Sequence, residues 1–115
     1  MKLLAAIVLA LAGCGGGGDG GCSVAYEVIG SNSFQTILMM FALPGGGTGQ
    51  VTANVYPKAF HEEYHFKSGE VMSISGRNTD DVNSEFEVRI IVDGRIRARS
   101  EGFSFSTASA KYTCP

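Results

Sequence analysis

From Val24 onward, short runs of β-branched and aromatic residues alternate with turns rich in glycine, asparagine, aspartate and proline. No long stretch repeats its apolar residues at the three- to four-residue interval of an amphipathic helix. The pattern is typical of β-strands joined by tight turns. We expect strands over residues 24–29, 34–43, 50–56, 64–66, 71–76, 85–91, 95–101 and 103–112. The sequence therefore predicts an all-β fold, a small immunoglobulin-like β-sandwich of seven to eight antiparallel strands.

The hairpin around residues 93–94 allows its register to be predicted from side-chain chemistry. A two-residue turn there pairs Ile90 with an arginine and brings charge onto the apolar face. A three-residue loop over residues 92–94, with Gly94 as the bulge residue, instead pairs Ile90 with Ile96 and turns the arginines outward. We therefore expect the three-residue loop.

The N-terminus carries a second informative pattern. Lys2 precedes the apolar run 3–11, which is too short to span a bilayer, and the run ends in Leu-Ala-Gly at 11–13 followed by Cys14. This segment resembles a bacterial lipoprotein signal. The resemblance implies cleavage before Cys14 and acylation of that cysteine, so that a lipid anchor holds the protein on a membrane. An uncleaved apolar N-terminus and an ordinary secretory signal with a chance cysteine are the alternatives.

The predicted organisation has three parts: a signal peptide at 1–13, a lipidated cysteine with a Gly-rich flexible tether at 14–21, and one β-sandwich domain at 22–115. Gly15 stands where an aspartate would retain a lipoprotein at the inner membrane. The resemblance therefore implies the periplasmic leaflet of the outer membrane, or the cell surface. Without Lys2, eight Lys and Arg face eleven Asp and Glu, a net charge of −3 that argues against a nucleic-acid partner.

Two cysteines remain if Cys14 carries lipid, and they stand at the two ends of the predicted domain. We expect Cys22 and Cys114 to form a disulfide, because an exported domain folds in an oxidising compartment. Such a bond would remove about 4–5 kcal/mol of unfolded-state entropy. A pair of free thiols and an intermolecular disulfide are the alternatives.

Residues 61–65 match the His-Glu-x-x-His pattern of zinc proteases, in which a helix sets two histidines beside a glutamate base. Here Pro57 lies just before the pattern, and residues 67–69 would end a helix after about two turns. In a strand, His61 and His65 lie about 13 Å apart, too far to share an ion. A zinc-dependent hydrolase using His61, Glu62 and His65 is therefore only an alternative, and we expect neither an enzyme nor a cofactor.

Arginines form a local cationic patch on an otherwise acidic chain: Arg89, Arg95, Arg97 and Arg99. Such a patch suits lipid phosphates, anionic glycans or the acidic face of a partner. The alternative is a solvated strand face whose charges protect a sheet edge.

Four segments, 24–30, 58–60, 64–69 and 88–94, together resemble the MmpS-type domain of small membrane proteins. The resemblance implies an envelope-facing β-sandwich, and some family members are accessory partners of lipid or siderophore exporters. This chain differs in having a lipid anchor and two terminal cysteines. We expect a non-enzymatic lipoprotein of the cell envelope that works as an accessory or binding module, with an envelope transporter or another membrane protein as its partner. A structural lipoprotein without a transport role is the alternative.

Overall fold

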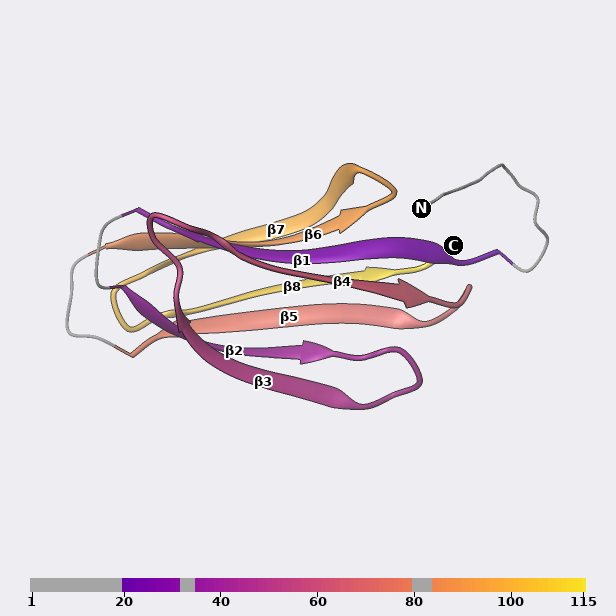
Figure 1. Cartoon of the computed structure of the whole chain (residues 1–115), viewed down its shortest axis with the longest axis horizontal. Coiled ribbons are helices and arrows are strands. Elements are labelled where there is room, and N and C mark those ends of the chain that lie inside the picture. The colour runs from indigo at the N-terminus through magenta and orange to yellow at the C-terminus, as the bar shows by residue number, and fades with distance from the viewer. Residues whose placement is uncertain (1–19, 32–34, 80–83) are drawn as a thin grey trace.

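The computed structural model describes residues 20–31, 35–79 and 84–115 (Figure 1). These residues form eight strands and no helix. The strands are β1 (Cys22–Gly30), β2 (Thr36–Ala42), β3 (Thr48–Asn54), β4 (Phe60–Phe66), β5 (Val71–Asn78), β6 (Glu85–Val92), β7 (Arg95–Phe103) and β8 (Thr107–Thr113). The all-β prediction is confirmed.

The strands form two antiparallel sheets of four strands each, in the orders β4-β1-β6-β7 and β3-β2-β5-β8. The sheets lie face to face in a body of 47 × 24 × 18 Å, with all strands along the long axis (Figure 1). The central strands bury alternate residues, as in β1, where every second side chain from Cys22 is buried, whereas the edge strand β3 has no fully buried residue. The two buried rows meet in one apolar core.

Tyr26 of β1 connects the two sheets at the centre of this core. Its side chain is fully buried, and its ring packs 5.3 Å from the ring of Phe41. The register of β2 with β5 ends at Phe41 and Ile74. Beyond that pair, the Tyr26 hydroxyl donates to Ala42 O (2.7 Å) and accepts from Ser73 N–H (3.3 Å). A side chain of one sheet thus completes the hydrogen bonding between two strands of the other.

The β6–β7 hairpin differs from the predicted register. The turn has two residues, Asp93 and Gly94, both with positive φ (50° and 85°), and Val92 pairs directly with Arg95. This conformation suits the right-handed twist of a hairpin, and Asp-Gly is a favoured sequence for it. The predicted three-residue loop is therefore wrong.

The bulge that the sequence predicted at Gly94 lies instead farther along β7. Ile91 pairs with Ile96 but Ile90 pairs with Ala98, so Arg97 is a bulge. The bulge places Ala98 rather than an arginine opposite the buried Ile90. Ile96 consequently faces outward and is 47% exposed, whereas the predicted register had buried it.

The last strand starts later than expected. β8 begins at Thr107, because residues 103–106 form a turn with Ser104 at φ 56°. Ser106 closes this turn: its hydroxyl accepts from Phe103 N–H (2.7 Å) and its own N–H donates to Phe103 O (3.1 Å). Phe103 and Phe105 are therefore half-exposed at the tip of a turn.

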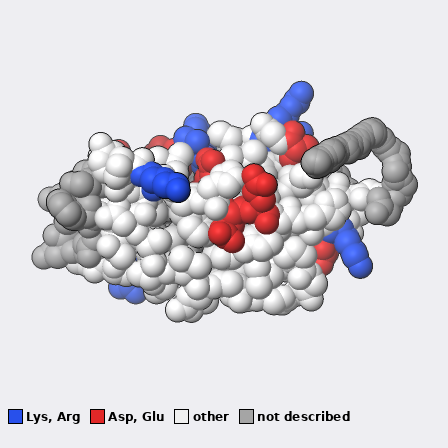
Figure 2. Space-filling view, in the orientation of Figure 1, with Lys and Arg blue, Asp and Glu red and all other residues white. Residues whose placement is uncertain are grey.

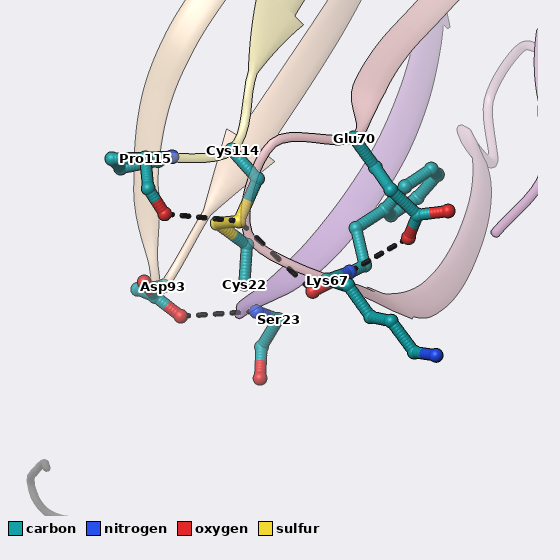
Figure 3. Close-up of a disulfide and its surroundings, with 8 residues drawn as sticks. Cys22, Ser23, Lys67, Glu70, Asp93, Cys114 and Pro115 are labelled. Carbon is teal, nitrogen blue, oxygen red and sulfur yellow. Dashed lines mark hydrogen bonds between the residues drawn. A yellow bond between two sulfur atoms is a disulfide. The ribbon is translucent and has the colours of Figure 1, made fainter. Parts of the chain in front are cut away.

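A disulfide joins Cys22 to Cys114, as predicted from the sequence, with the Cα atoms 6.0 Å apart (Figure 3). Cys22 begins β1 in one sheet and Cys114 follows β8 in the other, and both are buried. Two turns lie beside the bond: Gly69 N–H of the turn 67–70 donates to Cys114 O, and Asp93 N–H of the turn 93–94 donates to Ser23 O. We call this region the disulfide end of the sandwich.

Candidate functional site

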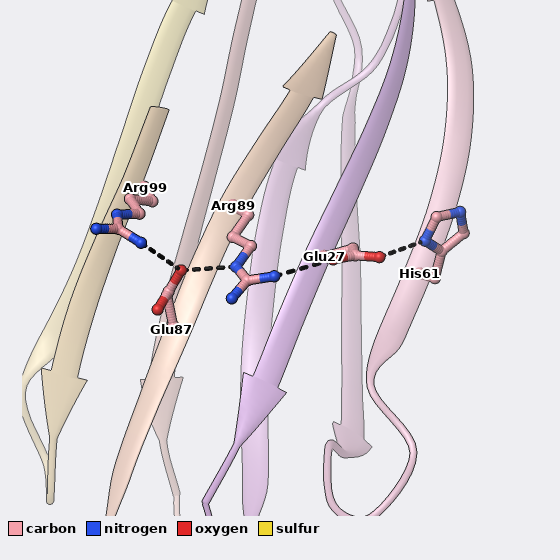
Figure 4. A network of polar contacts seen from close by, with 5 residues as sticks. All are labelled: Glu27, His61, Glu87, Arg89 and Arg99. Carbon is pink, nitrogen blue, oxygen red and sulfur yellow. Dashed lines mark hydrogen bonds and ion pairs between the residues drawn. The ribbon is translucent and has the colours of Figure 1, made fainter. Parts of the chain in front are cut away.

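A row of charged side chains crosses the outer face of the β4-β1-β6-β7 sheet (Figure 4). Glu27 of β1 lies opposite His61 of β4 on one side and opposite Arg89 of β6 on the other. Its Oε2 is 3.0 Å from His61 Nδ1, and its Oε1 is 3.7 Å from Arg89 Nη1. Cross-strand neighbours of opposite charge attract, so the register itself creates these pairs.

Glu87 continues the row toward β7. The register places Arg89 directly opposite Arg99, two like charges that would repel. Glu87 Oε2 accepts a hydrogen bond from Arg89 Nε at 2.6 Å and lies 3.9 Å from Arg99 Nη1. One carboxylate therefore screens the two guanidinium groups from each other.

His61 is held by two carboxylates. Its Nε2 lies 2.9 Å from Glu63 Oε2, in addition to the contact of Nδ1 with Glu27. These hydrogen bonds, first to Glu63 and then to Glu27, raise the pKa of His61 above its ordinary value. The imidazole is thus favoured in its charged form, which donates through both nitrogens and does not bind metal.

The His-Glu-x-x-His residues lie on strand β4, not on a helix. His61 and His65 lie opposite Glu27 and Ser23 on the outer face, whereas Glu62 lies opposite the buried Tyr26 and belongs to the other side of the strand. Among the residues that the structure describes, no group of three or more His, Cys, Asp or Glu is placed to hold a metal ion. The constellation of a zinc protease is therefore not formed by these residues.

A shallow depression of about 520 Å³ lies on the same face, at the half nearer the disulfide end. Two small residues of β1, Ser23 and Ala25, lie between taller side chains of the neighbouring strands. His65 and Glu63 line the depression on the β4 side, and Ile91 lines it on the β6 side. The hollow follows from the small residues of one strand.

The four arginines of the predicted patch separate into two pairs. Arg89 and Arg99 belong to the ion-pair row described above. Arg95 and Arg97 lie at the start of β7, are exposed, and have no carboxylate within ion-pair distance among residues 20–31, 35–79 and 84–115. Of these four arginines, the two without an ion pair among the described residues thus lie at the disulfide end.

Sequence reasoning missed the surroundings of Arg95 and Arg97. It placed Ile96 in the core, whereas the bulge at Arg97 exposes Ile96 between the two arginines. The Arg-Ile-Arg order was the available signal, but the direction of the isoleucine depended on where the bulge lay. Cys14, the predicted site of lipidation, lies outside the described residues, as do the signal peptide and most of the tether.

Figure 2 shows how charge is distributed over one face of the molecule. Acidic side chains gather at mid-length over β4, and basic side chains project at the disulfide end, on the right of this view, as well as toward the opposite end on the left. The part formed by β2 and β3 is nearly free of charge, and β3 itself contains no charged residue.

Comparison with protein-family models and with curated proteins finds no match for this chain. In the part of the chain that the structure describes, no helix has the length and hydropathy to cross a membrane. The functional assignment therefore depends on the residues and the geometry described above.

Proposed function

We propose that the chain is a lipid-anchored, non-enzymatic accessory or binding module of the cell envelope, similar to the MmpS-type domain. The observation that carries this proposal is the disulfide between Cys22 and Cys114. Disulfides form and persist outside the cytoplasm. The bond also closes the domain directly after Gly20 and Gly21, where the predicted Gly-rich tether ends, so an anchor at Cys14 would hold the disulfide end nearest the membrane.

The fold supports an immunoglobulin-like assignment as part of this proposal. Two antiparallel sheets of four strands enclose one core, as in sandwiches of that type. The position of His61, which is engaged by Glu27 and Glu63 on a strand, favours a structural role over zinc hydrolysis.

In this proposal the partner-facing surface is the edge strand β3. Leu43 N–H donates to Gly47 O and Val55 N–H donates to Gln35 O, so the odd-numbered residues between them bond to β2. The backbone groups of Thr48, Gln50, Thr52 and Asn54 consequently point away from the sheet. With no charge, proline or bulge among its residues, β3 lacks the usual protection of a free edge. An extended segment of an envelope transporter would add to this edge as a further strand.

The anchor is tested by replacing its cysteine. With Cys14→Ala, we expect the protein to leave the detergent phase and the washed membrane fraction, because acylation no longer holds it there. Unchanged partitioning of this variant would refute the lipid anchor.

The binding role is tested by affinity capture of the tagged full-length protein from gently crosslinked membranes. We expect an exporter subunit to be recovered with the parent chain and to be lost from a Gln50→Lys, Thr52→Lys variant, because lysines on the edge oppose strand addition. A Thr107→Lys, Ser109→Lys variant is the matched control, since it adds the same charge to β8, the other edge of the same sheet. Recovery of unrelated envelope proteins alone would instead favour a structural lipoprotein.

A further inference from the structure

We propose that the disulfide end of the sandwich is itself a membrane-contact site for anionic phospholipid. Arg95, Arg97 and Lys67 would bind lipid phosphates, and Ile96 would enter the headgroup layer. The inference rests on the proposed lipid anchor and assigns a ligand to the two arginines that the ion-pair row does not use.

The hairpin tip is fixed to the point where the tether enters the domain. Asp93 N–H donates to Ser23 O at 2.8 Å, and Ser23 N–H donates to Asp93 Oδ1 at 3.1 Å. Ser23 directly follows Cys22, so these two bonds and the disulfide hold the start of β1 and the β6–β7 turn together (Figure 3). Arg95 follows that turn immediately.

The tether keeps this end close to the lipid. Eight residue steps separate Cys14 from Cys22, and a Gly-rich chain of that length has a root-mean-square span of about 16 Å. A tether of this span allows the cations of the disulfide end to approach within the distance of about 8–10 Å over which the potential of an anionic membrane surface decays. The anchor therefore presents the disulfide end, and not the far end some 47 Å along the body, to the headgroups.

The charges of the disulfide end suit an anionic surface. Glu70 accepts hydrogen bonds from Lys67 N–H at 2.7 Å and from Gly45 N–H at 2.8 Å. Both bonds lower the pKa of Glu70, and the bond from Lys67 N–H has the larger effect. Asp93 is likewise occupied by Ser23 N–H. Both carboxylates stay charged but bond to the backbone, and the three cations Lys67, Arg95 and Arg97 outnumber them and make no ion pair within the described residues.

The apolar component is Ile96. It is 47% exposed, pairs with Ile91 on the outer face, and stands between Arg95 and Arg97 because Arg97 is a bulge. An isoleucine flanked by two guanidinium groups matches the composition of interfacial membrane contacts, where apolar side chains enter the headgroup layer and cations stay at the phosphates. Guanidinium also binds phosphate through two parallel hydrogen bonds.

The chain contains no tryptophan, so one can be introduced as a local reporter. The experiment uses the full-length acylated protein with Ile96→Trp in vesicles of equal parts phosphatidylglycerol and phosphatidylcholine. We expect the tryptophan emission to shift to the blue and to be quenched by lipids with brominated acyl chains. The matched control is Phe105→Trp, which places a reporter at a site of similar exposure (49%) at the far end. Its emission should stay that of a solvent-exposed residue.

Two further variations test the lipid chemistry. Arg95→Gln with Arg97→Gln in the Ile96→Trp background should abolish most of the blue shift and quenching, as should vesicles of phosphatidylcholine alone. Hydrogen exchange of residues 93–97 in the unsubstituted protein gives an independent measurement, and anionic vesicles should slow it.

The outcomes separate this inference from the function on which it rests. If the protein sediments with the vesicles but the reporter at 96 stays solvent-exposed and exchange at 93–97 is unchanged, the membrane contact is refuted and the anchor stands. If the protein does not sediment at all, the anchor fails and the contact with it. If the two arginine substitutions abolish co-purification of a protein partner without changing the quenching, the site binds protein and the lipid assignment is overturned.

Discussion

The hydroxyl of Tyr26 is a single polar group on which two strands of the opposite sheet depend. It satisfies Ala42 O and Ser73 N–H beyond the end of the β2–β5 register, inside an apolar core. Burial raises the pKa of this hydroxyl to about 12, so it stays protonated and keeps donating at any ordinary pH.

Tyr26→Phe should therefore cost about 0.5–1.5 kcal/mol in the free energy of unfolding, since it leaves a part-buried donor and a part-buried acceptor without this partner. Urea unfolding measures the change. Tyr64→Phe is the control, because its hydroxyl donates only to Glu62 at the surface (3.2 Å) and should change stability by less than about 0.5 kcal/mol. Equal effects of the two substitutions would contradict the role given to Tyr26.

His61 makes stability depend on pH. Glu63 and Glu27 raise the pKa of His61 in the folded protein. The contribution of His61 to the free energy of unfolding is therefore fully present below the ordinary histidine pKa of 6.5, and it is lost as the pH rises through the raised pKa. We expect His61→Ala to lower the free energy of unfolding more at pH 5.5 than at pH 8.5, which lie about one unit below and about two units above the ordinary histidine pKa.

The size of this effect is limited because the His61 side chain is 43% exposed, and exposed pairs contribute about 0.2–1 kcal/mol. Urea midpoints of both proteins at the two pH values give the comparison. His65→Ala is the control from the same strand, because His65 has no hydrogen bond or ion pair within the described residues for the substitution to remove. A larger loss at the higher pH would contradict the assignment.

At the scale of the elements, the β6–β7 turn depends on the backbone conformation of one residue. Gly94 has φ +85°, a conformation that a β-branched residue resists. Gly94→Val should destabilise the protein by at least about 1–2 kcal/mol, whereas Gly94→Asn, which tolerates positive φ, should cost less. Chemical denaturation compares the two, and equal losses would show that side-chain size and not backbone conformation matters.

The strands were largely predictable and the details of their ends were not. Alternation of buried and exposed residues, as in β1 and β6, follows from the period of a strand, and the sequence therefore located all eight elements. Side-chain polarity in the β6–β7 hairpin correctly indicated that β7 holds one extra residue as a bulge, but it could not distinguish Gly94 from Arg97 as the position of that bulge. The bond from Ser23 N–H to Asp93, which ties down the two-residue turn, joins residues 70 positions apart.

The candidate site was predictable only in part. That His61 and His65 share one side of a strand follows from their spacing. Which partners hold His61 does not, because Glu27 and Arg89 meet it only through the pairing of three strands distant in sequence. The division of the arginines into two pairs likewise depended on the bulge.

At the scale of the whole molecule, the disulfide is the largest single constraint. It closes a loop with a sequence separation of 92, for which the loss of unfolded-state entropy is worth about 4–5 kcal/mol. Replacing Cys22 and Cys114 together by serine should lower the free energy of unfolding by that amount. Reduction of the parent protein should give the same result. A loss below about 1 kcal/mol would mean that the unfolded chain gains little freedom without the bond.

The same bond also sets an order of events during biogenesis. One of its cysteines begins the first strand and the other follows the last, so the thiols meet only after all eight strands have been delivered and paired. A chain that lacks β8 would therefore leave Cys22 without its partner, so the bond between Cys22 and Cys114 marks a chain in which all eight strands are present.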